Sequence, residues 1–207
     1  MTSWIRRDFS AAGITQSPPG PHLARIQTRF GGTVMLMIDV SGSMNGRPIR
    51  EAVRGAQRFV TEAVEAGYHV GVMLWNTTVV SVCDPTPDGN AARRVLGPVR
   101  SAAGGNDLIG PLVRCHQILG HFTGDRVVAL FGDGDLTPKA AVLAKVAEMK
   151  ADNIRFVTRG LGSTAAVEFG EISDEDSTSA RVDRVDELAT GIAGMSASLK
   201  SVRRSAR

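Results

Sequence analysis

Three oxygen-bearing side chains follow an apolar run near the start of the sequence. Asp39, Ser41 and Ser43 alternate with small or apolar residues directly after the run 34–38, which is continuously apolar. Such a run is typical of a buried parallel strand, and open α/β sheets bind ligands at the carboxyl ends of their strands. Carboxylate and hydroxyl oxygens are hard donors, which suit Mg²⁺ far better than zinc or copper. The spacing therefore predicts a magnesium site at the end of this strand.

The rest of the chain alternates between segments typical of strands and of helices. Residues 46–66 have helical periodicity, with apolar side chains on one face and arginines on another. Further strands are expected at 68–75, 78–82, 126–131, 154–159 and 180–182, and further helices at 91–96, 107–119, 137–150, 164–169 and 186–202. Thr137 fits the N-cap of its helix and Pro138 the first helical position. The alternation predicts a parallel sheet with helices on both faces, and the turn at Asn76-Thr77 predicts an antiparallel edge hairpin.

Three loops of the sequence resemble, in order, the metal-ion-dependent adhesion site of von Willebrand factor type A domains. Residues 39–43 read D-x-S-x-S, like the first loop of that site. Residues 104–108 read GGNDL, like the second loop (usually GGT-D-L), and residues 131–134 read FGDG, like the third (usually T/S-D-G after an apolar strand). A single D-x-S-x-S would be weak evidence, whereas three loops in this order indicate the family. The resemblance implies a Rossmann-like α/β fold with an open, mostly parallel central sheet of about six strands and one antiparallel edge strand.

The same resemblance implies which residues bind the metal. Mg²⁺, or alternatively Mn²⁺, would be held by Asp39, Ser41, Ser43, Asn106 and Asp133, the serines directly and the aspartates directly or through waters. With no further protein carboxylate, the ion stays electrophilic enough to accept an Asp or Glu of a partner protein. The family usually has a threonine where this chain has Asn106; the amide oxygen is also a hard donor, but it need not reproduce the threonine geometry. Such binding makes and breaks no covalent bond, so the resemblance implies that the protein is not an enzyme.

Length and composition are consistent with one domain. A chain of 207 residues that is 43% hydrophobic can bury one substantial core. We expect an N-terminal extension at 1–32, the von Willebrand factor type A domain at 33–202, and a basic C-terminal tail at 203–207. No segment reaches the roughly 18 apolar residues of a membrane span, and the first residues contain no apolar core of a signal peptide. The two cysteines lack the spacing of a disulfide framework or a metal site.

These features predict a cytoplasmic, bacterial protein-binding module. Intracellular members of the family work beside AAA+ ATPases or in stress-response systems, and the chain loosely resembles the small members associated with tellurite resistance. The arginines at positions 47, 50, 54 and 58 could attract nucleic acid, but no aromatic side chains interleave with them, which favours a solvated helix face.

Two alternatives to this interpretation stay open at the level of sequence. Asp39 and the later Gly132-Asp133-Gly134-Asp135 are also similar to a Mg²⁺-dependent phosphatase of the haloacid dehalogenase type. In that family a second aspartate acts as general acid, and this chain has Ser41 in its place. That family also uses a lysine to stabilise the phosphate. Here this lysine would have to be Lys139, which follows the metal loop instead of preceding it. The other alternative is a von Willebrand factor type A scaffold that binds no metal.

Overall fold

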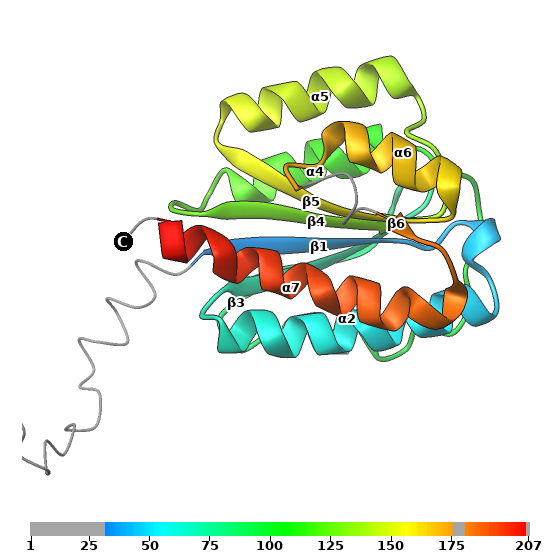
Figure 1. Cartoon of the computed structure of the whole chain (residues 1–207), viewed down its shortest axis with the longest axis horizontal. Coiled ribbons are helices and arrows are strands. Elements are labelled where there is room, and N and C mark those ends of the chain that lie inside the picture. Colours follow the sequence, from blue (N-terminus) through cyan, green and yellow to red (C-terminus); the bar gives the residue numbers. More distant parts are fainter. Residues whose placement is uncertain (1–31, 176–180, 206–207) are drawn as a thin grey trace, which may run out of the picture.

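A six-stranded sheet forms the centre of the molecule (Figure 1). The computed structural model describes residues 32–175 and 181–205. Within these ranges the strand order is β3-β2-β1-β4-β5-β6. The strands are β1 (Thr33–Asp39), β2 (His69–Trp75), β3 (Val79–Thr86), β4 (Arg126–Gly132), β5 (Ile154–Leu161) and β6 (Arg181–Val182). Only the edge pair β2–β3 is antiparallel among these strands, which confirms the predicted fold class.

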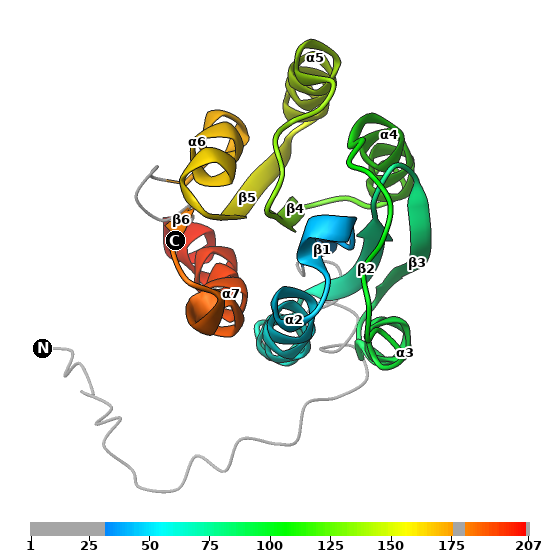
Figure 2. The ribbon, with the colours of Figure 1, turned by 90° about the vertical axis from the view of Figure 1, so that its right-hand side faces the viewer.

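Helices cover both faces of the sheet (Figure 2). One face carries α2 (Arg47–Glu65), α3 (Asn90–Leu96) and α7 (Leu188–Ser205), and the other carries α4 (Ile109–Leu119), α5 (Lys139–Ala151) and α6 (Ser163–Ile172). Alternate residues of β1 enter the two cores: Leu36 and Ile38 pack on the α2 side, and Met35 and Met37 on the α4 side. Because both faces of this strand are buried, its sequence is apolar throughout instead of alternating.

The direction of the chain across the sheet reverses at β1. After β1 the chain forms β2 and the edge strand β3, then returns to place β4 on the other side of β1. Ile38 is in register with Phe131, so the carboxyl ends of β1 and β4 lie next to each other. Ligands of open α/β sheets bind where the strand order reverses in this way. The fold therefore brings the first and third predicted metal loops to the usual ligand position.

Two elements differ from the sequence predictions. The edge strand β3 continues through Pro85 to Thr86, whereas we expected a strand at 78–82 only. Proline lacks an N–H, but an edge strand has a side without a neighbour and tolerates it. The predicted start of α5 is also wrong, because that helix begins at Lys139 and Thr137 does not cap it. The Thr137 hydroxyl instead donates to Asp135 Oδ1 at 2.9 Å.

Two acidic residues that follow α6, Asp174 and Glu175, bind to β5. Arg159 of β5 is only 7% exposed and forms an ion pair with Glu175. Asp174 Oδ2 accepts a hydrogen bond from the Phe156 N–H at 2.7 Å. A buried guanidinium requires a charged or polar partner, and the acidic segment supplies it. The described part of this segment thereby fixes the chain to the end of the sheet.

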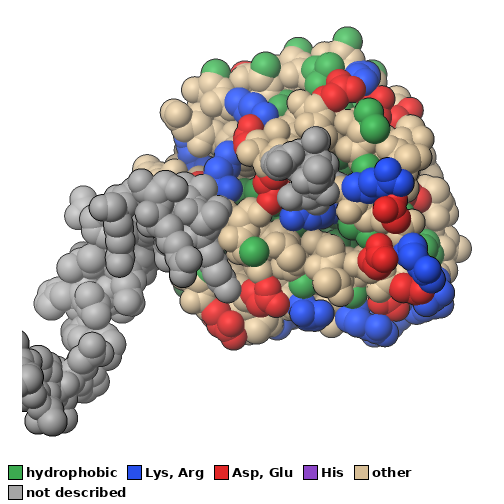
Figure 3. Space-filling model, viewed as in Figure 1, with side chains coloured by type: hydrophobic (Ala, Val, Ile, Leu, Met, Phe, Trp, Pro, Cys, Tyr) green, Lys and Arg blue, Asp and Glu red, His purple; other side chains and the backbone are tan. Residues whose placement is uncertain are grey.

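Arginines of α2 form ion pairs with acidic side chains. Arg54 lies 3.1 Å from Glu51, and Arg47 pairs with Asp186. Figure 3 shows basic and acidic side chains interspersed along the lower edge, where α2 lies. Exposed pairs of this kind contribute little to stability, and they reduce the net positive charge of this face.

The structure describes little of the N-terminal segment and most of the C-terminal one. The predicted extension at 1–32 lies outside the described residues except for Gly32, and α7 continues through Ser205, into the segment expected as a tail. No helix in the described ranges is both long enough and apolar enough to span a lipid bilayer.

Candidate metal centre

The first loop holds Asp39 in a fixed, buried position. Asp39 is the last residue of β1, and its carboxylate is fully buried. The Ser41 N–H donates to Asp39 Oδ1 at 2.7 Å, which turns the chain sharply after the strand. Asp39 Oδ2 is buried without a hydrogen-bond partner among the described residues. Gly132 makes room for this oxygen, because a Cβ at that position would lie 3.0 Å from it.

Hydroxyl groups connect the first loop to the third. Ser41 Oγ and Ser43 Oγ lie 3.2 Å apart, and the Ser43 hydroxyl donates to Asp133 Oδ1 at 2.8 Å. Ser43 and Asp133 are 90 positions apart in the sequence, and the adjacency of β1 and β4 brings them together. Ser41, Ser43 and Asp133 thus form one continuous group of oxygen atoms, and the Ser41 N–H connects Asp39 to it.

Asn106 joins this group through the third loop. Its Nδ2 donates to the Asp135 carbonyl at 3.1 Å, while its Oδ1 is buried without a partner among the described residues. Gly134 permits this position, since a Cβ there would lie 2.0 Å from Asn106 Nδ2. The second loop is also fixed to the first, because the Gly42 N–H donates to the Gly104 carbonyl at 3.0 Å. The fold therefore brings all three predicted loops together.

Asp107, next to Asn106, has a different role. Its Oδ1 accepts a hydrogen bond from the Ile109 N–H at 3.0 Å, at the start of α4. This is the helix-terminal position that a carboxylate favours, because N–H groups there have no partner within the helix. Asp107 thus stabilises the helix start and lies beside the candidate centre.

Asn76 is a positioning residue that the sequence analysis treated only as part of a turn. Its Nδ2 donates to the Ala103 carbonyl at 2.8 Å, and its own carbonyl accepts the Asp107 N–H at 3.0 Å. Its Oδ1 accepts the Thr78 N–H at 3.2 Å, a contact typical of an Asx turn. The Asx turn could have been predicted from an asparagine after a strand. The contact of Asn76 with the second loop could not.

The two carboxylates occupy surroundings that disfavour their charge. Burial raises the pKa of Asp39 to about 6, and the nearby charge of Asp133 adds to this effect, while hydrogen bonds from Ser41 oppose it. Burial also raises the pKa of Asp133, against the hydrogen bond from Ser43. Two desolvated acids placed together are stabilised by a bound cation.

The residues present fit a hard divalent cation. They offer two carboxylates, two hydroxyls and one amide oxygen, and the two buried oxygens without partners belong to Asp39 and Asn106. Nowhere in the described ranges do three His, Cys, Asp or Glu side chains cluster as in a zinc site. Mg²⁺ usually keeps several of its waters and needs only one or two carboxylates from a protein, so two carboxylates with neutral oxygens suit it. Bound there, the cation would supply a positive charge that attracts an external carboxylate.

Gly134→Ala tests the placement of Asn106. The added methyl group would collide with the amide and displace it, so we expect the affinity for Mg²⁺ to fall about tenfold, as when metal ligands lose their supporting contacts. Calorimetric titration measures the affinity and thermal unfolding checks the fold. Gly110→Ala in α4, where a Cβ meets nothing within 4 Å, is the matched control. An unchanged affinity in Gly134→Ala would remove Asn106 from the set of ligands.

Comparison with known families agrees with the fold and the order of the loops. The sequence profile of the von Willebrand factor type A domain matches residues 34–135, the region from β1 to the third loop. The chain is therefore a protein of the von Willebrand factor type A family. Domains of this family are generally protein-interaction modules and not enzymes. Among curated protein sequences, none is similar enough to be a relative of this chain.

Solved structures share the fold at low sequence identity. A von Willebrand factor type A protein from Catenulispora acidiphila superposes with a TM-score of 0.65 at 19% identity, over 82% of this chain and 43% of that one. The pilus adhesin SpaC from Lactobacillus rhamnosus GG gives 0.66 at 14% identity, over 82% of this chain and 30% of that one. The corresponding domain of the pilus tip protein Mfa5 from Porphyromonas gingivalis gives 0.71 at 12% identity, over 83% and 95%. The chain thus spans less than half the length of the first two of these proteins.

The phosphatase alternative loses support from the position of its lysine. Lys139 Nζ lies 3.0 Å from Glu168 and 2.7 Å from Glu171, so two carboxylates of α6 hold it. A phosphate-binding lysine would be aimed at the carboxylates of the centre.

Proposed function

We propose that this domain binds a partner protein through a Mg²⁺ ion held by Asp39, Ser41, Ser43, Asn106 and Asp133. The observation that carries the proposal is the buried Asp39 Oδ2, which has no hydrogen-bond partner among the described residues, at the end of a strand where the sheet order reverses. A buried carboxylate oxygen without a partner is costly, and a cation is the partner that this oxygen set suits. Mn²⁺ would fit the same donors.

The ligand that the ion would receive from the partner is a carboxylate. Two protein carboxylates offset the charge of a divalent cation, and the remaining donors are neutral, so an external Asp or Glu is still attracted. Without the ion, the acidic side chains at positions 39, 107, 133 and 135 would repel that same group. Binding should therefore require the metal.

The setting that we propose is intracellular, as an adaptor beside an AAA+ ATPase or in a stress-response system. Both cysteines are free thiols, Cys115 buried and Cys83 half-buried, which is consistent with a reducing compartment. Two of the structural neighbours are a pilus adhesin and a pilus tip protein, and a role in surface assembly is the alternative. Detecting the native chain in cell fractions would separate the two.

Calorimetric titration of MgCl₂ and MnCl₂ into EDTA-treated protein tests the metal centre. We expect a single binding event for each ion, because the oxygen donors form one continuous group. Asp133→Ala should weaken binding at least tenfold through the loss of one carboxylate. Asp135→Ala is the matched control, since that carboxylate is bound to the Thr137 hydroxyl instead. The absence of any binding in the wild type would favour a scaffold that works without metal.

A further inference from the structure

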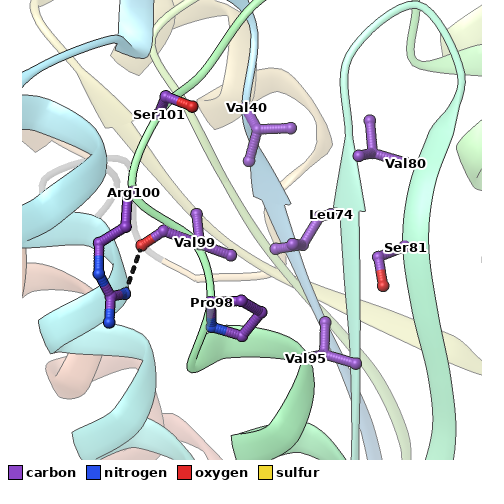
Figure 4. A pocket seen from close by; sticks show the side chains of 9 residues that line it. All are labelled: Val40, Leu74, Val80, Ser81, Val95, Pro98, Val99, Arg100 and Ser101. Atoms are coloured by element: carbon purple, nitrogen blue, oxygen red, sulfur yellow. Dashed lines mark hydrogen bonds between the residues drawn. The ribbon is translucent and has the colours of Figure 1, made fainter.

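An apolar hollow lies next to Val40, the residue between Asp39 and Ser41 (Figure 4). It has a volume of about 260 Å³ and lies between the β2–β3 hairpin and the segment that follows α3. Its lining comes from the residue after β1, from both strands of the hairpin, from α3 and from that segment. The lining includes Val40, Leu74, Val80, Val95, Val99 and Ser101. Val80 is 53% exposed, so an aliphatic side chain faces solvent at the rim.

The hollow and the candidate metal centre are built from the same two loops. Val40, which lines it, stands between Asp39 and Ser41 in the sequence. The Val40 carbonyl accepts the Ala103 N–H at 2.8 Å, within the loop that begins at the lining residue Ser101 and leads to Asn106. The same two loops therefore build the apolar hollow and carry metal ligands. A segment bound at one of these places lies within reach of the other.

The size and chemistry of the hollow fit a side chain. Pockets for small molecules and cofactors usually measure about 300–1,000 Å³, so this one is small for such a ligand. Its walls are mostly aliphatic, and an aliphatic or aromatic side chain would exclude water from them. Interfaces commonly bury one such anchor in a pocket near their centre.

The charge around the hollow favours an acidic segment. Residues 95–101, five of which line one wall, contain Arg100 but no aspartate or glutamate. Arg100 and the nearby Arg94 are exposed, and the Arg100 Nη1 donates to the Val99 carbonyl at 2.8 Å, on the outer side of this wall (Figure 4). On the other side of β1, the loop after β4 carries Asp135, which would repel an acidic chain. An acidic segment leaving the metal is therefore directed toward the hollow.

We propose that the partner segment which binds the metal through its Asp or Glu also places an aliphatic or aromatic side chain in this hollow. The proposal rests on the function proposed above and adds the chemistry of the partner: an acidic polypeptide segment with an apolar residue a short distance from its metal-binding carboxylate. Two sites on one segment would also give specificity that a single carboxylate cannot provide.

Selection of peptides from a random phage library that bind the full chain in Mg²⁺ tests both the metal-dependent binding and the occupation of the hollow. Clones released by EDTA should contain an acidic residue and an apolar residue at a preferred spacing. EDTA-released clones with an acidic residue but no apolar preference would overturn this inference and leave the metal function standing. If EDTA releases no clones, both proposals fail. Apolar clones that EDTA does not release would separate the hollow from the metal centre and overturn the inference.

A synthetic peptide from the EDTA-released clones then tests the hollow directly. Val80→Glu puts a negative charge at the rim, and we expect it to weaken binding of this peptide at least tenfold while the affinity for Mg²⁺ alone stays within twofold of the wild type. Val167→Glu is the matched control, because Val167 is 67% exposed on α6, on the other face of the sheet. Equal losses in the two variants would overturn the proposal.

Two other occupants of the hollow are distinguishable with the same variant. Dimerisation of the wild type that Val80→Glu abolishes would assign the hollow to a second copy of the chain. Loss of hydrogen-exchange protection in residues 1–31 of Val80→Glu, without any peptide, would assign it to that segment. Either result would overturn the proposal of a partner side chain.

Discussion

Asp39→Ala is expected to reduce the affinity for Mg²⁺ more than 100-fold. Asp39 contributes a buried oxygen that has no partner in the described part of the chain, and its carboxylate is fixed by the Ser41 N–H at 2.7 Å. Loss of one of two charged ligands should exceed the 10–100-fold effect that is usual for residues supporting a metal ligand. Calorimetric titration of EDTA-treated wild type and variant measures the difference. Equal affinity in the two proteins would contradict the assignment of the centre.

The same residue should reduce the stability of the metal-free protein at neutral pH. The folded chain raises the pKa of Asp39 from 3.8 to about 6, so the folded state binds this proton more tightly than the unfolded state does. The resulting stability is fully present below pH 3.8 and is lost as the pH rises through about 6. At 1.36 kcal/mol per pH unit, this loss amounts to about 3 kcal/mol.

Asp39→Asn isolates this effect because asparagine has no proton to exchange in this range. In EDTA, the variant should be more stable than the wild type at pH 7.5, and the difference should shrink as the pH falls through the window from about 6 to 3.8. Chemical denaturation at several pH values measures it. Saturating Mg²⁺ should reverse the order at pH 7.5, because only the wild type gains binding free energy. A difference between variant and wild type that does not change with pH would contradict the raised pKa.

Gly160→Ala should destabilise the fold by about 3 kcal/mol, near the upper end for overpacking. Gly160 lies near the carboxyl end of β5, between Gly132 of β4 and Arg181 of β6. A Cβ there would lie 2.4 Å from the Ala165 carbonyl carbon and from the Ala166 nitrogen. These are backbone atoms of α6, so no change of rotamer relieves the contact and the helix must move away from the sheet. For a chain of this size the melting temperature should fall by about 10 °C.

Gly170→Ala is the control for this substitution. Gly170 lies within α6, and a Cβ there meets nothing within 4 Å. Alanine is a better helix former than glycine, so we expect a gain of about 0.5–1 kcal/mol. If both variants melted at the same temperature, the close packing of α6 on β5 would be wrong.

Local patterns predicted most of the elements. The apolar run at 34–38 predicted a strand buried on both faces, and the structure confirms it in β1. The helical periodicity after residue 46 is likewise confirmed in α2. These patterns are readable because burial on one or two faces imposes a period on nearby residues. The start of α5 was not predictable in this way, since the contact of Thr137 with Asp135 competes with capping.

Contacts between distant segments could not be predicted from such patterns. The ion pair of Arg159 with Glu175 depends on how the chain after α6 returns to the sheet. The bond from Asn76 to the second loop and the apolar hollow beside Val40 depend on the approach of three loops. Each involves residues whose own neighbourhoods in the sequence give no sign of the partner.

The sequence by itself determined that a buried strand leads into Asp39 and which loop residues carry hard oxygen donors, because strand formation and side-chain chemistry are local properties. Only the tertiary structure decided that Asp39 and Ser43 face Asp133, since the packing of helices on both faces puts β4 next to β1 rather than beyond β3. It also decided that Asp39 Oδ2 is buried without a hydrogen-bond partner in residues 32–175 and 181–205, because Gly132 of the adjacent strand leaves space there that a side chain would fill.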